Sequence, residues 1–313
     1  MTKKQQAKGI AMLTLCALIW GSAFVAQSNA MQYVESFTFQ SARSFLGALV
    51  LLPWILVRRK KGTATKSDKK TFLKVGLACG VTLCIACCLQ QFGIYYNDLA
   101  ASIAGTATDG AVVGKAGFVT ALYILLVPLF GLFLKKKVGG KVWVGVVLAL
   151  VGLYLLCMTG KTRPDFGDIL VFGSAIFFAI QILIVDSFID KVDGVELSCF
   201  QFAVVGVLSG LGMLAFEQPS LSAVCGAWVE ILYAGAMSSG LAYTLQILGQ
   251  KYTPPTLASM LMSLESVFAV LAAALLLGQI PTWVQVCGCV LMFAAIVLAQ
   301  LPEKKKNKDV QPD

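Results

Sequence analysis

The 313-residue sequence contains no histidine, and only 13% of its residues are charged. Soluble globular proteins average about 25% charged residues, so a water-facing surface around the whole chain is excluded. No phosphate-binding loop, metal-ligand cluster or nucleophile–base pair is visible, and no polar segment is long enough to form a nucleotide-hydrolysing domain. The sequence therefore predicts neither an enzyme nor an ATP-driven pump, with no catalytic residues, no metal and no cofactor.

Apolar residues make up 58% of the chain and occur in runs of about 20 residues, the length that crosses a bilayer as a helix. The runs are continuous rather than alternating, which favours helices over strands of a barrel. They predict an all-α polytopic membrane protein with the lipid bilayer as its partner. The ten expected transmembrane helices are residues 8–30, 37–57, 72–96, 116–134, 141–159, 166–188, 195–216, 228–250, 255–277 and 282–301.

Cysteine is plentiful, but its placement argues against redox or metal chemistry. Nine of the ten cysteines lie in apolar runs, including Cys84 and Cys87 in a C-x-x-C spacing. Without a histidine partner, these thiols are interpreted as small packing residues. Cys225 alone falls in a loop, so no disulfide framework is predicted.

The sequence repeats. The octapeptide at 89–96 matches that at 245–252 in four positions, and two further pairs match at constant spacing. The matched residues are Leu89, Gln90, Gly93 and Tyr96 with Leu245, Gln246, Gly249 and Tyr252; Glu35 and Gln40 with Glu196 and Gln201; and Gly145 and Gly152 with Gly288 and Ala295. We expect two homologous repeats, 1–160 and 165–301, followed by a disordered tail, 302–313. Because five spans is an odd number, the second repeat must enter the membrane inverted, which is typical of secondary transporters.

The net charge of +9 could suggest nucleic-acid binding, but the basic residues lie between the spans, where they report membrane orientation instead. With the N-terminus inside, 21 of the 25 Lys and Arg residues are inside, and only Lys115, Lys161 and Arg163 are outside. This ratio predicts a plasma (inner) membrane protein with both termini cytoplasmic and no nucleic-acid partner. It also predicts external loops at 97–115 and 161–164; the first, rich in Ala, Gly, Ser and Thr, is expected to be a mobile cover.

Two charged residues lie within expected spans. Glu265 is the only deep carboxylate, about nine residues into its span and near the bilayer centre. Such a residue is costly unless protonated or paired, so it is a functional hypothesis by default. It is either a proton-coupling switch or a neutral acid that binds a neighbouring helix. Arg43 is always charged; it could pair with Glu265, contact an anionic substrate group or snorkel outward.

Three intramembrane amides and two aromatic residues complete the candidate cavity. Gln90, Gln181 and Gln246 could contact substrate or could join helices by hydrogen bonds. Trp20 lies mid-span, away from the interfacial belt that tryptophan favours. Trp20 and Tyr123 are therefore candidates either for a cavity wall or for ordinary packing.

The residues that carry a family resemblance lie in spans one, two, four and nine. They are residues 17–24 (ALIWGSAF), residues 40–51 around Arg43, residues 115–123 (KAGFVTALY) with Pro128, and residues 258–278 around Glu265. In this order they resemble the EamA-type permeases of the drug/metabolite transporter superfamily. The resemblance implies ten helices, cytoplasmic termini, a central cavity, and export or exchange of small metabolites such as amino acids. The chain departs from the family pattern at Ser266 and Gln279, where proline and glutamate are frequent, and in its longer link at 97–114.

These observations predict a secondary permease that moves a small organic metabolite, amino-acid-like or drug-like, by alternating access. We expect a monomer or weak homodimer. The alternative is an ion- or proton-conducting channel, which fits less well because a channel needs symmetric pore rings from an oligomer.

Overall fold

The computed structural model describes residues 2–65, 67–103, 111–136, 138–157, 165–277 and 281–301. Within this part of the chain the regular secondary structure is entirely helical. Nine helical segments are long and apolar enough to span a bilayer, and a tenth apolar helix, Gly140–Leu156, is slightly shorter. The expected all-α polytopic class is confirmed. The expected loop at 161–164 and the tail at 302–313 lie outside the described residues.

The helices give ten membrane-crossing segments, three of them built from more than one helical piece. The fourth consists of α4 and α5, the eighth of α10, the π-helix η1 and α11, and the ninth of α12 and α13. The bounds are α1 Lys3–Ala30, α2 Ser36–Lys60, α3 Lys69–Ile103, α4 Ala111–Ala121, α5 Tyr123–Phe133, α6 Gly140–Cys157, α7 Phe166–Phe188, α8 Gly194–Phe216, α9 Leu221–Gly226, α10 Trp228–Leu232, η1 Tyr233–Ala242, α11 Tyr243–Gln250, α12 Pro255–Met262, α13 Glu265–Leu277 and α14 Trp283–Gln300.

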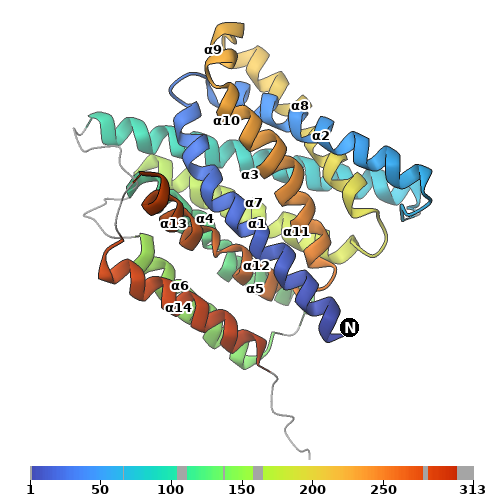
Figure 1. Ribbon diagram of the computed structural model, residues 1–313, viewed down its shortest axis with the longest axis vertical. Helices are drawn as coiled ribbons and strands as arrows, with labels where there is room; N and C mark the ends of the chain where they lie inside the picture. The colour runs from blue at the N-terminus through green and yellow to red at the C-terminus, as the bar shows by residue number, and fades with distance from the viewer. Residues whose placement is uncertain are drawn as a thin grey trace, which may run out of the picture.

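The helices pack on each other in the pairs that the predicted inverted repeat requires. The second span, α2, packs along its counterpart α8, and the fifth, α6, packs along its counterpart α14. The third span packs on the sixth (α3 on α7), and correspondingly the eighth packs on the first (η1 and α11 on α1). The start of α1 and the end of α14 lie at the same end of the bundle (Figure 1). This exchange of partners is what a pseudo-two-fold axis in the membrane plane produces.

Glycine allows α6 and α14 to touch through their backbones. A Cβ atom added at Gly288 would lie 2.6 Å from the Gly152 carbonyl oxygen, and one added at Gly145 would lie 3.0 Å from that of Ala295. Such close approach is characteristic of small residues at membrane helix interfaces, where no hydrophobic effect drives association. Sequence positions that matched between the repeats therefore meet across the pseudo-axis.

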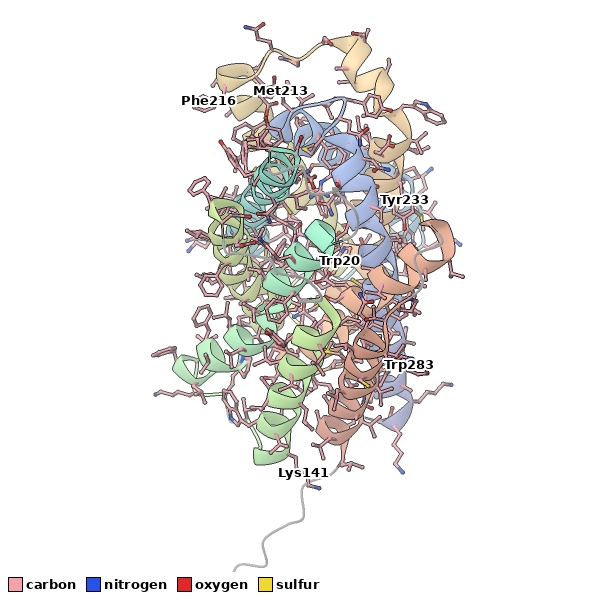
Figure 2. The ribbon with its side chains drawn as sticks, turned by 90° about the vertical axis from the view of Figure 1, so that its left-hand side faces the viewer. Trp20, Lys141, Met213, Phe216, Tyr233 and Trp283 are labelled. Carbon is pink, nitrogen blue, oxygen red and sulfur yellow. The ribbon has the colours of Figure 1, made fainter. Side chains whose placement is uncertain are left out.

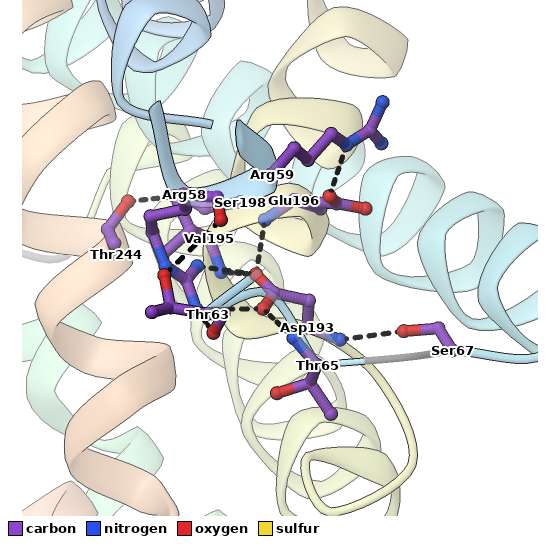
Figure 3. A network of polar contacts seen from close by, with 10 residues as sticks. All are labelled: Arg58, Arg59, Thr63, Thr65, Ser67, Asp193, Val195, Glu196, Ser198 and Thr244. Atoms are coloured by element: carbon purple, nitrogen blue, oxygen red, sulfur yellow. Dashed lines mark hydrogen bonds and ion pairs between the residues drawn. The ribbon is translucent and has the colours of Figure 1, made fainter. Parts of the chain in front are cut away.

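Polar contacts join α2 and α8 at both ends. At one end the Glu217 carboxylate accepts the backbone N–H groups of Phe37 (2.6 Å) and Thr38 (2.7 Å), which are free donors of the first turn of α2. At the other end Arg58 forms a bidentate ion pair with Asp193, at 2.8 and 2.9 Å (Figure 3). The two helices are thus held in register along their whole length.

Asp193 also caps α8, because its Oδ1 atom accepts the N–H groups of Val195 and Glu196. Burial raises the pKa of the Asp193 carboxyl, but hydrogen bonds from Arg58 and from the backbone N–H groups of Thr65 and Glu196 lower it more, so this pKa lies below its ordinary value. The carboxylate therefore stays ionised at neutral pH and serves both as helix cap and as counter-ion.

Part of the expected loop at 97–115 is helical. Helix α3 continues through Ile103, and α4 begins at Ala111, while residues 104–110 lie outside the described residues. Asn97 lies against the capping box at the start of α7, and Asp98 accepts a hydrogen bond from Ser28 of α1 at 3.0 Å. Residues 97–103 are therefore part of a membrane-crossing helix and do not belong to a loop. The connection between the expected spans that end at 216 and begin at 228 contains a short helix, α9.

Candidate functional site

Two membrane spans contain an irregular turn, and they are counterparts in the inverted repeat. The turn lies at Leu122, between α4 and α5, and at Ser263 and Leu264, between α12 and α13, and the backbone at Leu122 and Ser263 stays right-handed helical. At each turn the backbone tightens to i→i−3 hydrogen bonds, from Leu125 to Leu122 and from Ser266 to Ser263. Irregularities in corresponding positions of two inverted halves point to a transporter's binding site.

The residue that follows each turn faces the other. Tyr123 opens α5 and Glu265 opens α13, and the Tyr123 hydroxyl donates to Glu265 Oε1 at 3.1 Å. Both side chains are buried. The N-terminus of α13 carries partial positive charge, which favours a carboxylate there. The pair therefore connects the two repeats across the site.

A small cavity, lined by both polar and aromatic side chains, lies beside this pair. All seven residues selected from the sequence line it: Trp20, Arg43, Gln90, Tyr123, Gln181, Gln246 and Glu265. Trp20 lies about halfway along the bundle, between Phe216 at one end and Lys141 at the other (Figure 2). The role of the seven selected residues as substrate ligands stays a prediction.

Arg43 is 3% exposed and is held by neutral amides. Its Nε atom donates to Gln40 Oε1 at 2.8 Å, and its Nη1 atom donates to Gln27 Oε1 at 3.1 Å. None of the six ion pairs among the described residues involves Arg43 or Glu265. The structure thus disfavours two of the three interpretations of Arg43, pairing with Glu265 and snorkelling to the surface. A buried guanidinium that forms no ion pair with any described residue remains on the cavity wall.

Four buried glutamines form a hydrogen-bonded chain beside the cavity. Gln250 Nε2 donates to the Ile182 carbonyl oxygen at 2.9 Å. Gln246 Nε2 donates to Gln250 at 3.2 Å and to Gln181 at 2.9 Å, and Gln181 Nε2 donates to Gln201 at 3.3 Å. Gln181 and Gln246 thus join helices and line the cavity at the same time, so the two interpretations of these amides are not exclusive.

Two cavity residues carry a buried polar atom with no partner among the described residues: the Trp20 Nε1 donor and the Gln246 Oε1 acceptor. The Trp20 ring packs on that of Tyr243, with centroids 4.6 Å apart. Buried polar groups are satisfied in nearly all native structures, so each exception needs an explanation. Both residues line the cavity, where water or a bound molecule can supply the missing partner.

The cavity includes polar residues that sequence reasoning missed: Gln27, Thr120, Ser238 and Tyr243. Each had a detectable signal. Gln27 follows Trp20 by two helical turns, and Thr120 and Tyr243 precede Tyr123 and Gln246 by three residues, which places each pair on one helix face. Ser238 lies in η1, and short π-helical stretches within α-helices occur frequently at functional sites.

Phe24 lines the cavity and belongs to a buried apolar cluster from four helices: Phe24, Ile94, Ala116 and Val171. Lys115, next to Ala116 in the sequence, forms ion pairs with Asp165 at 3.0 Å and with Asp168 at 2.8 Å. These pairs join α4 of the first repeat to α7 of the second.

The residues that the structure describes include no group of three His, Cys, Asp or Glu side chains that could hold a metal ion. The ten membrane-crossing segments of the described residues, arranged as inverted halves around a polar cavity, have the architecture of a secondary membrane transporter.

Comparison with known proteins agrees. The profile of the EamA-like transporter family matches residues 7–158 and again residues 165–301, and the chain belongs to this family. An uncharacterized transporter of Archaeoglobus fulgidus is 31% identical over 296 residues, which cover 92% of this chain and 84% of the relative. The uncharacterized transporter YetK of Bacillus subtilis is 24% identical, covering 100% and 92% of the two chains. A solved crystal structure superposes with a TM-score of 0.74 at 18% identity, covering 94% of this chain and 96% of that one, which supports the fold.

Proposed function

We propose that this transporter carries a small zwitterionic metabolite, of the amino-acid type, across the plasma membrane by alternating access. The proposed unit is two inverted repeats, 1–160 and 165–301, with both termini cytoplasmic. Substrate would bind in the central cavity, and the irregular turns in the fourth and ninth spans would let the two repeats rearrange around it. Export or exchange is the expected direction for the family.

The observation that carries this proposal is that a buried guanidinium and a buried carboxyl group line the same cavity without pairing with each other. Arg43 and Glu265 line one cavity, yet Arg43 is bonded to Gln27 and Gln40, and Glu265 to Tyr123. A buried charge without a counter-ion is costly. A substrate with an ammonium group and a carboxylate would supply both missing partners. The aromatic rings of Trp20 and Tyr243 offer an apolar wall for the rest of the molecule.

The test is a panel of the twenty standard amino acids, with binding measured as thermal stabilisation of the purified protein. The strongest binder is then compared with its decarboxylated amine and with its deaminated acid. Because hydrogen bonds to charged groups contribute about 1.5–3 kcal/mol, wild type should prefer the amino acid to the amine by at least tenfold. Arg43→Gln should lose that preference and keep the preference over the acid.

Arg58→Gln is the matched control, because Arg58 lies on the same helix but outside the cavity. It should keep the ligand preference of wild type while losing stability. Counterflow of the bound amino acid in proteoliposomes should saturate, whereas a non-saturating ion current would indicate a channel. The proposal fails if no amino acid stabilises the protein, or if Arg43→Gln prefers amino acid over amine as strongly as wild type.

A further inference from the structure

The glutamine chain beside the cavity has a fixed hydrogen-bond polarity. The Ile182 carbonyl oxygen can only accept, so the amide of Gln250 must present its Nε2 atom to it. The Gln250 Oε1 atom then faces Gln246 and must accept from it. One backbone carbonyl therefore determines how the first side-chain amide is oriented, although amide oxygen and nitrogen have nearly the same shape.

The same logic passes along the chain. Gln246 Nε2 has two N–H groups, and they go to Gln250 Oε1 and Gln181 Oε1. Gln181 must then donate through its own Nε2 atom to Gln201 Oε1. Reversing any one amide would place two acceptors or two donors against each other. The orientation of all four side chains follows from the anchor at Ile182.

With the amides in this orientation, two of their polar atoms have no hydrogen-bond partner among the described residues. Gln246 Oε1 is an acceptor without a donor, and Gln201 Nε2 is a donor without an acceptor, among the described residues. Gln246 is 1% exposed and lines the cavity, whereas Gln201 does not line it. Both N–H groups of Gln246 are occupied, so its carbonyl oxygen is the only group that this side chain can offer to a ligand.

We propose that Gln246 is a specificity-determining residue whose carbonyl oxygen accepts a hydrogen bond from an N–H or O–H group of the substrate. Gln250 is the positioning residue that keeps this oxygen, rather than the amide nitrogen, available to the ligand. This inference rests on the proposed function and adds a requirement to it. The substrate must bring a donor to a fixed, neutral acceptor, in addition to its two charges.

The physical basis is the cost of an unmade bond. A buried acceptor left unpaired costs about 1–3 kcal/mol, so replacing the substrate's donor hydrogen by a methyl group should weaken binding by about 5- to 150-fold. Sites built to bond a substrate N–H or O–H reject analogues that lack it more strongly than apolar pockets reject a change in size.

The experiment uses three matched pairs of probes that differ only by methylation of a donor. They are L-leucine with its N,N,N-trimethyl derivative, L-glutamine with its side-chain N,N-dimethyl derivative, and L-tyrosine with O-methyl-L-tyrosine. Dissociation constants come from ligand-dependent thermal stabilisation of the full-length protein. Wild type should discriminate against the methylated member of at least one pair by about fivefold or more.

Three substitutions of glutamine by methionine, which has a similar shape, then separate the roles of Gln246, Gln250 and Gln201. Gln246→Met should reduce that discrimination to within about threefold, because it removes the acceptor. Gln250→Met should weaken it while leaving Gln246 in place, because the amide of Gln246 is then free to turn over. Gln201→Met should leave it unchanged, because Gln201 lies at the far end of the chain and outside the cavity.

The outcomes separate the two proposals. If no amino-acid probe stabilises wild type, the proposed function fails, and this inference fails with it. If probes bind but wild type discriminates within no pair, or if Gln246→Met discriminates as wild type does, then the specificity role alone is wrong. A purely structural role of Gln246 would lower stability without changing the ratio within any pair. If Gln246→Met does not fold, unchanged discrimination in Gln250→Met overturns the positioning argument.

Discussion

At the scale of single residues, the carboxyl group of Glu265 is the feature that an experiment can test most directly. It is buried, it accepts one hydrogen bond from Tyr123, and no cation among the described residues pairs with it. The chain has no histidine, so no imidazole can relay protons near neutral pH. If transport is coupled to protons, Glu265 is the side chain that can carry the coupling.

Glu265→Gln tests this prediction, because glutamine mimics the protonated acid in shape. Under proton coupling, the variant should still exchange substrate for substrate but lose its response to a pH gradient. If Glu265 has a structural role, the substitution should either reduce both substrate exchange and the response to a pH gradient or change neither. The measurement is uptake and counterflow in proteoliposomes with and without an imposed gradient.

Glu230→Gln is the control, because Glu230 lies on α10 and outside the cavity. It should behave as wild type in both assays. A Glu265→Gln transporter that still concentrates substrate on a proton gradient would rule out the coupling role.

At the scale of helices, the molecule combines rigid and interrupted elements. The counterparts α2 and α8 are joined at both ends by Glu217 and by the Arg58–Asp193 pair. The fourth and ninth spans instead contain tightened turns near the middle, next to the cavity. Mid-helix turns of this type are frequent at functional hinges, so we expect any rearrangement of the two repeats to use them.

Asp193→Asn tests the contribution of the α2–α8 junction. Asparagine can still cap α8, but it loses the charge that pairs with Arg58, so we expect a loss of about 1–3 kcal/mol of stability at pH 7. Because the pKa of Asp193 is lowered in the folded protein, its stabilising effect is present above the ordinary aspartate pKa of about 4 and is lost as pH falls below it.

The measurement is thermal unfolding of both proteins in detergent between pH 3 and pH 8. The difference between wild type and Asp193→Asn should shrink as the pH drops below about 4. Asp190→Asn is the control, since Asp190 lies in the same connection but is 83% exposed and 3.9 Å from Lys251. A difference that does not depend on pH would mean that the Asp193 charge contributes nothing to stability.

At the scale of the whole molecule, the inverted packing and the distribution of positive charge make one joint prediction. The connection between α2 and α3 and the helix α9 should lie on opposite sides of the membrane. The excess of Lys and Arg predicts a cytoplasmic position for the first of these. With ten spans in the inverted arrangement, the second is then predicted to lie outside.

Single cysteines on a cysteine-free background test this topology. Thr63→Cys and Ser222→Cys place exposed thiols in the α2–α3 connection and in α9. An impermeant thiol reagent applied to intact cells should label Ser222→Cys, and it should label Thr63→Cys only after the cells are opened. The reverse pattern would invert the proposed orientation and leave the fold unchanged.

The sequence alone determined the ten spans, the inverted repeat and seven of the residues that line the cavity. It did so because lipid penalises every unsatisfied polar group, so continuous apolar runs report spans and the exceptions within them report a site. Gln90, Gln181, Gln246 and Glu265 stand out for this reason before any contact is known.

Only the tertiary structure decided which of these residues meet. Tyr123 and Glu265 are 142 positions apart and are joined by a hydrogen bond, while Arg43 is held by Gln27 and Gln40 instead of by Glu265. The extension of α3 past its polar residues, the irregular turns in two spans and the polarity of the glutamine chain also depend on partners from distant segments. Local sequence preferences cannot specify them, because a buried polar side chain adopts whichever geometry its neighbours satisfy.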